Sequence, residues 1–241
     1  MALQPETAPP AVCTDRRVYT GAEFSKEIGM RYYDYRNAPS PRKVRLFIAE
    51  KGLEIPTEQV DLRSREQLRP DFLAKNPSGG VPLLELDDGT CLSESLAICH
   101  YLEQRHPQPN LMGLDAREQA LVLMWNDIQT YEGYLGIQEV LRNGHEAFKD
   151  RALGGPVPYA QIPALAERGR KRAEVYFDRL EARLEASPFI ASARFTYADI
   201  VGYVYLGFAV RSLGHDPAAE RPALKRWSET VAARPAIKAA G

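Results

Sequence analysis

Strand-like runs and one amphipathic helical pattern alternate at the start of the folded part of the chain. Residues 31–35 are rich in aromatic side chains, which favour strands, and residues 58–62 form a second strand-like run. Between them, apolar residues recur at helical spacing over 41–52, with Pro41 suited to the first helical position and Gly52 to the C-cap. This order predicts a β-α-β unit with parallel strands and a right-handed crossover.

A second helix, a hairpin and a third helix follow this unit. We predict a short helix over residues 65–74 and another over 93–104. The pair Asp88-Gly89 separates two short apolar runs, and such a pair indicates a hairpin because the turn needs positive φ. The predicted order across residues 30–105 is therefore β-α-β-α-β-β-α.

The remainder of the chain has helical periodicity and no strand pattern. It begins after the Pro-rich stretch 106–110, which is the best candidate for a linker. Apolar spacing predicts one long helix over 115–143, bent near Gly133, and a second over 164–186. This half is therefore expected to be all helical.

A capping motif precedes the most apolar helix of the chain. Thr196 and Asp199 have the spacing of a capping box, and Phe195 and Ile200 that of a hydrophobic staple. The helix that follows is nearly free of charge, so we expect it at the centre of its domain. A final amphipathic helix is predicted over 222–233.

Composition narrows the classes of partner. Of the 241 residues, 44% are hydrophobic and 26% charged, and the formal net charge is −1. Near-neutrality argues against a nucleic-acid partner, whose binding depends on phosphate neutralisation. The longest uncharged apolar stretch, 200–210, is too short to cross a membrane. Three cysteines, Cys13, Cys91 and Cys99, are too few and too dispersed for a disulfide scaffold or a zinc site, so we expect a soluble, cytoplasmic protein without metal.

The pattern divides the chain into three segments. Prolines interrupt residues 1–29 and no apolar face forms there, which indicates an N-terminal extension or translated sequence upstream of a start at Met30. We expect one domain over 30–109 and a second, helical domain over 110–241, both of ordinary size.

Three motifs, in this order, resemble the cytosolic glutathione S-transferase family. They are residues 76–84 (NPSGGVPLL), 94–98 (ESLAI) and 195–200 (FTYADI). The resemblance implies an α/β fold in which a thioredoxin-like domain binds glutathione and an all-α domain binds an electrophile. It also implies glutathione as a substrate, a small electrophilic co-substrate and a homodimer, to which Arg117, Met124 and the hairpin are candidate contributors.

The matching positions suggest how glutathione is held. Val81 can pair its backbone with the cysteinyl part of glutathione as an added strand, and the resemblance implies that the Val81–Pro82 bond is cis. Glu94 can bind the γ-glutamyl ammonium, and Ser95, at a helix N-terminus, favours the adjacent carboxylate. The alternative is that Ser93 caps this helix and Glu94 only complements its dipole.

The glycyl carboxylate of glutathione is harder to assign. Gln67 stands where related sequences often have His or Gln, and Arg63, Arg65 and Lys75 are near it in sequence. Each of these cations is also typical of a solvated surface.

The catalytic hydroxyl is the least clear feature. The chemistry requires a thiolate, and family members stabilise it with a Tyr, Ser or Cys near the start of the first helix. In this sequence the corresponding positions are residues 38–41, where Ser40 is the only hydroxyl and lies one or two residues after the usual Ser or Cys position. Tyr33 and Tyr35 lie on either side of the usual Tyr position. We take Ser40 as the candidate catalytic residue. None of the cysteines lies there, which argues against redox chemistry of the Cys-containing classes.

The pattern around Ser40 also resembles an atypical subclass that lacks this hydroxyl. In that subclass, helix N-terminal amides and a water held by polar residues activate the thiol. Gln138 and Arg142 lie at the matching positions and are our candidates for the electrophile side of the site. His145, one turn further, is an alternative to them, although a surface histidine is the more ordinary interpretation.

The electrophile pocket and the reaction leave further alternatives. The pocket is expected between residues 37–41, the long helix near Gln129 and Tyr134, and the C-terminal tail, with Trp125 in the core. The main expectation is a transferase acting on small hydrophobic electrophiles. A non-catalytic binding module and a glutathione-dependent isomerase, peroxidase or dehalogenase are the alternatives, because fold does not fix function.

Overall fold

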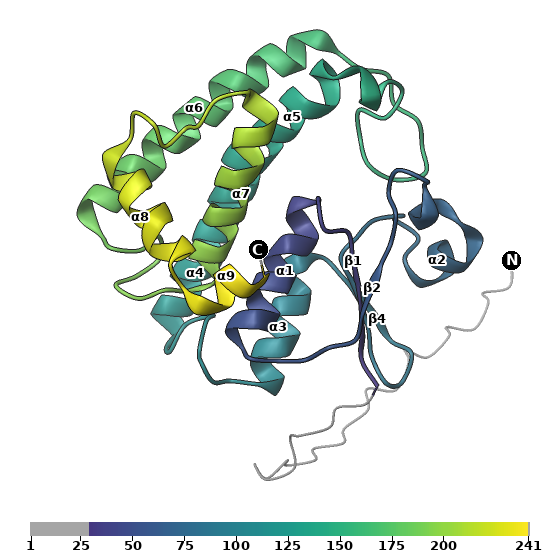
Figure 1. Ribbon diagram of the computed structural model, residues 1–241, viewed down its shortest axis with the longest axis horizontal. Coiled ribbons are helices and arrows are strands. Elements are labelled where there is room, and N and C mark those ends of the chain that lie inside the picture. The colour runs from purple at the N-terminus through teal and green to yellow at the C-terminus, as the bar shows by residue number, and fades with distance from the viewer. Residues whose placement is uncertain (1–28, 241) are drawn as a thin grey trace, which may run out of the picture.

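The computed structural model describes residues 29–240, so nearly all of the predicted extension, 1–29, lies outside the described residues (Figure 1). The elements of the first half are β1 (Arg31–Asp34), α1 (Pro39–Glu50), β2 (Thr57–Gln59), a 3₁₀ turn (Glu66–Leu68), α2 (Pro70–Lys75), β3 (Leu83–Glu85), β4 (Cys91–Ser93) and α3 (Ser95–Arg105). The strands form one sheet in the order β2-β1-β3-β4. Strand β1 pairs with β2 in parallel, as the predicted β-α-β unit requires, and β3 pairs antiparallel with β4, as the predicted hairpin requires; β1 also pairs antiparallel with β3.

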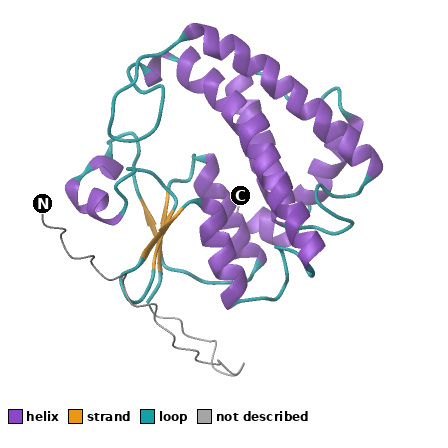
Figure 2. Cartoon of the chain, turned by 180° about the vertical axis from the view of Figure 1, so that it is seen from behind, coloured by secondary structure: helices purple, strands orange, loops and turns teal. Residues whose placement is uncertain are grey.

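Alternate residues of β1 build two separate apolar layers. Tyr32 faces the large core, and its hydroxyl donates to the Pro41 carbonyl of α1 (2.7 Å). Tyr33 points to the other face, where it packs with Val60, Phe72 and Leu83. Because successive strand residues point to opposite sides, the sheet lies between α2 on one face and α1 with α3 on the other (Figure 2).

Two local predictions in this half need correction. Helix α1 begins at Pro39 and not at Pro41, since Ala38 has extended backbone and Pro39 has the preset φ of a first helical residue. In the hairpin only Gly89 has positive φ (83°), whereas Asp88 does not. Gly52, with φ 65°, ends α1 in the left-handed conformation predicted for it.

The second half consists of helices in the described part of the chain. They are α4 (Ala116–Ile128), a π-helical segment (Gln129–Tyr134), α5 (Leu135–Gly144), a 3₁₀ turn (Glu146–Phe148), α6 (Pro163–Ala186), α7 (Tyr197–Leu213), α8 (Pro222–Ala232) and α9 (Pro235–Ala240). The predicted bend of the long helix is the π-helical segment around Gly133. A Cβ there would lie 2.6 Å from the Tyr176 ring, so glycine lets α6 approach closely. Within residues 29–240, no helix is both long and apolar enough to span a bilayer.

Helix α7 occupies the centre of the helical half, as its lack of charge predicts. Its capping box is present: the Asp199 carboxylate accepts the Thr196 N–H (2.9 Å) and also those of Ile190 (2.9 Å) and the Trp227 indole (2.9 Å). One buried carboxylate therefore joins the start of α7 to the preceding loop and to α8.

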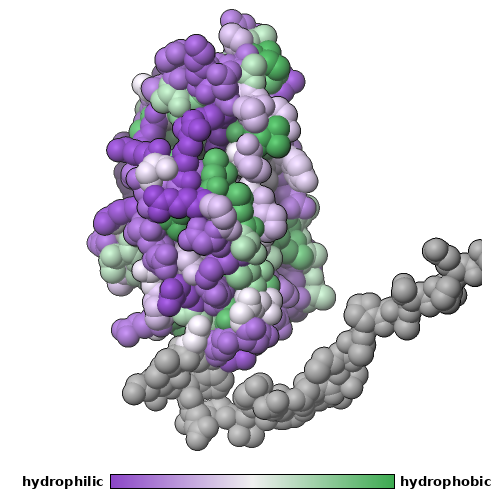
Figure 3. All heavy atoms as spheres, turned by 90° about the vertical axis from the view of Figure 1, so that its right-hand side faces the viewer, coloured by the Kyte–Doolittle hydropathy of each residue, from purple (hydrophilic) through white to green (hydrophobic). Residues whose placement is uncertain are grey.

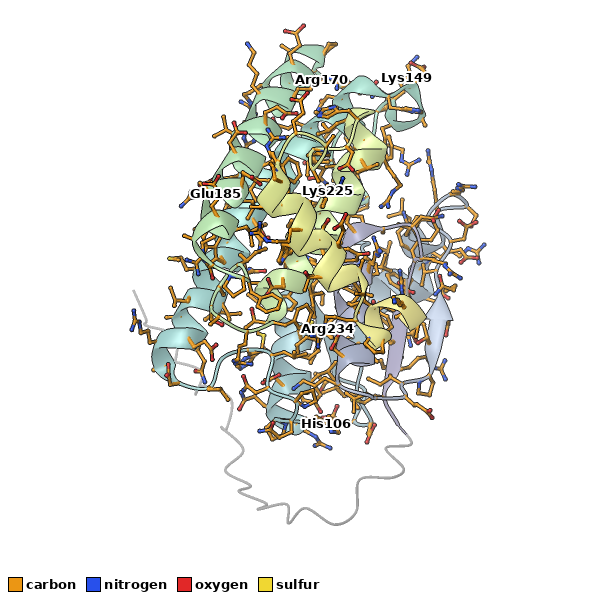
Figure 4. The ribbon with its side chains drawn as sticks, turned by 60° about the vertical axis from the view of Figure 1, so that its left-hand side comes forward. His106, Lys149, Arg170, Glu185, Lys225 and Arg234 are labelled. Carbon is orange, nitrogen blue, oxygen red and sulfur yellow. The ribbon has the colours of Figure 1, made fainter. Side chains whose placement is uncertain are left out.

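Helix α1 is the main link between the two halves. It packs on α7 and on α9, a short helix that the sequence pattern did not reveal. The Arg234 guanidinium, at the turn between α8 and α9, binds both Glu50 carboxylate oxygens (2.7 and 2.6 Å; Figure 4). The end of α1 is thus fixed to the helical half by a two-pronged ion pair.

Candidate active site

The starts of α1 and α3 meet beside the loop that leads into β3. The Ser95 hydroxyl, at the first residue of α3, donates to the Ser40 carbonyl in the first turn of α1 (2.9 Å). This contact joins two helix N-termini that are 55 residues apart in sequence. Since the N–H groups at a helix start favour anions, the junction is suited to a ligand with more than one negative group.

The loop before β3 presents an unpaired backbone edge. The Val81–Pro82 peptide bond is cis, as the resemblance implies. The Asn76 side chain shapes this loop by donating to the Gly80 carbonyl (2.8 Å) and accepting the Ser78 N–H (3.2 Å). No backbone hydrogen bond between the described residues uses Val81, because the pairing of β3 begins at Leu83. Val81 can therefore pair with an extended ligand.

Glu94 has a backbone conformation that side chains rarely adopt. Its φ is 67°, its side chain is exposed, and it occupies the N-cap position of α3 without a side-chain capping bond. A positive φ at a non-glycine residue carries strain that is typical of functional sites. The proposed alternative, Ser93 as the cap, does not describe this helix. The buried Ser95 side chain is already bonded to Ser40, so its backbone N–H is what it offers to a ligand.

Gln67 and Lys75 differ in whether their side chains are already hydrogen-bonded within the protein. Gln67 is 8% exposed, and its Oε1 has no hydrogen-bond partner within the described part of the chain. The Lys75 ammonium, in contrast, is bound by the Glu85 carboxylate (2.6 Å) and the Tyr33 hydroxyl (2.7 Å). The hydrogen bond with Glu85 raises the pKa of Lys75 and lowers that of Glu85. The unused capacity of Gln67 is that of an acceptor at Oε1, so a carboxylate would have to bind the NH₂ of the same side chain.

Among the described residues, the first turn of α1 has only one backbone N–H without a partner. Pro39 and Pro41 have no N–H, and the N–H groups of Ala38 and Arg42 are used by the Tyr35 and Ala38 carbonyls. Ser40 alone keeps a free N–H in this turn. Burial is the main cause that raises the pKa of Tyr134, and the Ser40 side chain acts on it in the opposite direction.

The helical half adds a small polar group opposite Ser40. Gln138 donates to the Tyr134 hydroxyl one turn before it (3.3 Å). Arg142 instead donates to the Arg151 carbonyl (2.9 Å) and lies over the Phe148 ring (5.2 Å). Burial lowers the pKa of Arg142. Arg142 therefore holds the loop after α5.

Comparison with known proteins shows the family to which this chain belongs. The sequence matches the glutathione S-transferase N-terminal domain over residues 38–105 and the C-terminal domain over 149–235. It is 31% identical over 229 residues to glutathione S-transferase 2 of Saccharomyces cerevisiae, covering 92% of this chain and 93% of the relative. The chain belongs to the glutathione S-transferase family.

Solved structures agree with this membership and confirm the fold class. A glutathione S-transferase domain-containing protein from Marinobacter aquaeolei is 32% identical with a TM-score of 0.79, covering 86% of this chain and 99% of that one. A class Gtt2 glutathione S-transferase of Vibrio parahaemolyticus is 32% identical with a TM-score of 0.75, covering 88% and 97%. This family member therefore has the thioredoxin-like domain followed by an all-α domain.

Gln129, which was expected near the electrophile, lies elsewhere in this family member, and His145 is the surface histidine that was the more ordinary interpretation. Gln129 is fully buried, donates to the Ala198 carbonyl (3.0 Å) and accepts from the Tyr176 hydroxyl (3.1 Å), so it belongs to the helical core. His145 is exposed and its ring accepts the Ala147 N–H (3.2 Å), which makes it a surface capping residue. Trp125 is buried, as expected.

An apolar loop from the helical half approaches the glutathione side. A Cβ on Gly155 would lie 3.3 Å from the Ser78 carbonyl, so the loop after α5 meets the loop before β3. Leu153, Val157 and Tyr159 are exposed on this loop. The face that carries α2 and this loop shows a strip of hydrophobic residues between hydrophilic ones (Figure 3). Such a surface suits an apolar co-substrate.

Neither of the two cysteines that the structure describes lies in the first turn of α1, and Cys13 is outside the described residues. Cys99 is buried in α3, and burial raises the pKa of its thiol; Cys91 lies on β4. In the described residues, no group of three or more His, Cys, Asp or Glu side chains is placed to hold a metal ion.

Sequence reasoning named Tyr134 as pocket lining but did not single out Lys43, which is buried three residues after Ser40 on α1. The available signal for Lys43 was a lysine directly beside Val44 on the apolar face of a short helix, where a charge has to be explained.

Proposed function

We propose that this chain is a glutathione transferase that adds the glutathione thiolate to small hydrophobic electrophiles. The observation that carries the proposal is the unpaired backbone of Val81 next to two joined helix N-termini. Glutathione is an extended tripeptide with a charged group at each end, which matches this combination. In the reaction, the thiol loses its proton to solvent, and its sulfur forms a bond to an electrophilic carbon, by addition or with departure of a leaving group.

The proposed contacts follow the length of the tripeptide. Glu94 binds the γ-glutamyl ammonium and the Ser95 N–H binds its carboxylate. Val81, ahead of the cis Pro82, pairs with the cysteinyl backbone, and Gln67 binds the glycyl carboxylate with its side-chain amide. These assignments place both ends of glutathione on the thioredoxin-like domain.

The proposed role of Ser40 is to place the sulfur at the start of α1. Its free N–H is the only one in that turn, and its hydroxyl already interacts with Tyr134. Gln138 and Arg142 shape the electrophile side, Gln138 through Tyr134 and Arg142 by holding the loop after α5. Replacing Ser40 by Ala removes the hydroxyl and keeps the N–H, so an unchanged thiol pKa in Ser40→Ala assigns the effect to the backbone.

The wider assembly is also part of the proposal. We place the domain boundary at the linker after α3, giving domains 30–109 and 110–241. Exposed Leu123, Met124 and Tyr131 leave an apolar stripe on and after α4 that suits a homodimer contact. The cytoplasm is the proposed compartment, because it keeps glutathione and the free cysteines reduced.

The second candidate is a non-catalytic glutathione-binding module. The observation that favours it is the small number of backbone donors in the first turn of α1. Its two prolines leave a single N–H among the described residues that could bind a thiolate. The two functions share the same binding groups and differ only in activation of the thiol.

Titration separates these functions. Glutathione is added while intrinsic tryptophan fluorescence is followed, and conjugation is measured with an activated aryl halide. Glu94→Gln is expected to raise Kd for glutathione about tenfold or more, the usual consequence of losing a charged contact. The exposed Glu54→Gln is the matched control. Absence of binding at millimolar glutathione would falsify the proposal, and binding without conjugation would favour the module.

A further inference from the structure

Helix α1 carries a buried lysine three residues after Ser40. Lys43 is 7% exposed, although it belongs to the second turn of α1. Its ammonium donates to the Tyr205 hydroxyl (3.0 Å) and lies 5.1 Å from the centre of that ring. None of the ion pairs formed within residues 29–240 includes Lys43. An ammonium has three donors, so its bonding capacity here is only partly used.

The groups that face Lys43 do not neutralise it. They come from three elements: Tyr205 from α7, Tyr134 from the π-helical segment and Cys99 from α3. Burial raises the pKa of Cys99 and of Tyr134, which keeps both of them protonated at neutral pH. Burial also acts to lower the pKa of Lys43, but its hydroxyl partners more than offset this, and the pKa of Lys43 is raised. The cluster therefore holds a positive charge without a carboxylate.

Such an arrangement is unfavourable unless an anion completes it. A buried charge requires a partner of opposite sign, and a single neutral hydroxyl does not supply one. Ser40 and Lys43 are three residues apart on α1, and helical residues at this spacing share one face of the helix. The Tyr205 ring, whose hydroxyl accepts the Lys43 hydrogen bond, stacks on the Tyr134 ring with centres 5.2 Å apart, so Lys43 and Tyr134 belong to one cluster.

The first turn of α1 needs this additional charge. Because of the two prolines, the Ser40 N–H is the one backbone donor of this turn without a partner in the described residues. A single N–H dipole stabilises an anionic sulfur only weakly. We propose that the buried ammonium of Lys43 is the counter-charge that stabilises the glutathione thiolate at the first turn of α1. This inference rests on the proposed function. The thiol proton leaves to solvent, the charge remains on sulfur, and no bond forms between sulfur and Lys43.

The test measures ionisation of the bound thiol. Thiolate absorbance of bound glutathione is followed against pH in the wild type, Lys43→Met, Lys43→Gln and Lys43→Arg, with the exposed Lys171→Met as control. The two neutral variants are expected to raise the thiol pKa by about one unit or more, as for a unit charge within about 10 Å of the sulfur. Lys43→Arg keeps the charge and is expected to restore most of the shift, and Lys171→Met to leave it unchanged.

A second ligand separates charge stabilisation from structure. S-methylglutathione has no ionisable thiol, so its Kd in Lys43→Met is expected to stay within about twofold of the wild type, well under the tenfold that about 1.4 kcal/mol represents. Retained binding with an unshifted thiol pKa overturns the inference and leaves the proposed function intact. Loss of S-methylglutathione binding in both neutral variants also overturns it, in favour of a structural role. Failure of the wild type to bind glutathione removes the proposed function itself.

Discussion

The two ends of α1 handle their charges in opposite ways. Near its start, Arg42 and Lys43 make no ion pair within the described part of the chain; Arg42 lies over the Tyr203 ring (5.4 Å) and Lys43 binds a hydroxyl. Toward its end every cation has a carboxylate. The pairs are Arg45–Asp34 (2.7 Å), Arg234–Glu50 (2.6 Å) and Lys51–Glu103 (2.5 Å). The contrast lies within one helix, so it reflects position rather than composition.

This difference suggests different roles for the two ends of α1: the end with completed ion pairs stabilises the fold, and the end with unpaired cations is suited to binding an anionic ligand. At the far end, Lys51 also donates to the His106 and Pro109 carbonyls (2.7 and 2.6 Å), which fixes the linker between the two halves. A completed pair holds one geometry and leaves no charge for a ligand. At the near end, charge without a partner destabilises the unliganded protein slightly and becomes useful when an anion arrives. Three variants test this contrast.

The largest effect is expected at the completed end. Lys51→Met leaves the Glu103 carboxylate buried without its cation, since the two side chains are 0% and 4% exposed. Losing one partner of a buried pair costs about 3–5 kcal/mol of unfolding free energy, to be measured by denaturant titration.

The control for Lys51→Met is an ion pair of the same type at the surface. Arg31 and Glu58 pair at 3.2 Å with side chains 56% and 52% exposed. Arg31→Met is expected to change the unfolding free energy far less than Lys51→Met does, because solvent screens exposed pairs. Similar losses in the two variants would mean that burial does not distinguish the pairs.

An ion pair in the helical half is expected to give an effect of intermediate size, which can be measured as the dependence of the unfolding free energy on pH. Arg194 binds Glu118 (2.7 Å), and this hydrogen bond lowers the pKa of Glu118 from 4.5 to about 2. The unfolded state then binds more protons than the folded state between these values. Stability from this group is therefore complete above about pH 4.5 and is lost as pH falls toward 2.

The expected size of that loss is up to about 3 kcal/mol. Unfolding free energies of the wild type and Arg194→Met, measured between pH 2 and 7, should converge at the acid end. A constant difference across the whole range would show that Arg194 acts through packing and not through the charge of Glu118.

Local signals in the sequence were enough to predict most of the fold. The Thr196–Asp199 capping box, the left-handed Gly52 and the Asp88-Gly89 hairpin each depend on residues within a few positions, and the structure has all three. Helix α9 was missed because its six residues contain too little periodicity. The start of α1 was misplaced because both Pro39 and Pro41 satisfy the rule for a first turn.

The site was less predictable because its contacts join distant segments. Gln129 and Tyr134 lie on the same long helical pattern, yet one is buried in the core and the other meets Ser40. The π-helical segment between them changes the face that each presents, and no periodicity rule anticipates it. The partner of Lys43, Tyr205, is 162 residues away. Motifs identify single residues, whereas tertiary packing decides which charges remain unpaired.

The smallest effect on stability is expected from Lys43→Met in the ligand-free protein. Lys43 is as buried as Lys51, but its removal leaves no carboxylate behind and ends the desolvation of an unpaired ammonium. We expect a change within about 1 kcal/mol, of either sign, by the denaturant titration used for Lys51→Met. Millimolar glutathione should then stabilise the wild type more than the variant, because ligand binding adds to folding stability in proportion to affinity. A loss as large as that of Lys51→Met would show that the start of α1 is also a structural support, and the contrast between its two ends would fail.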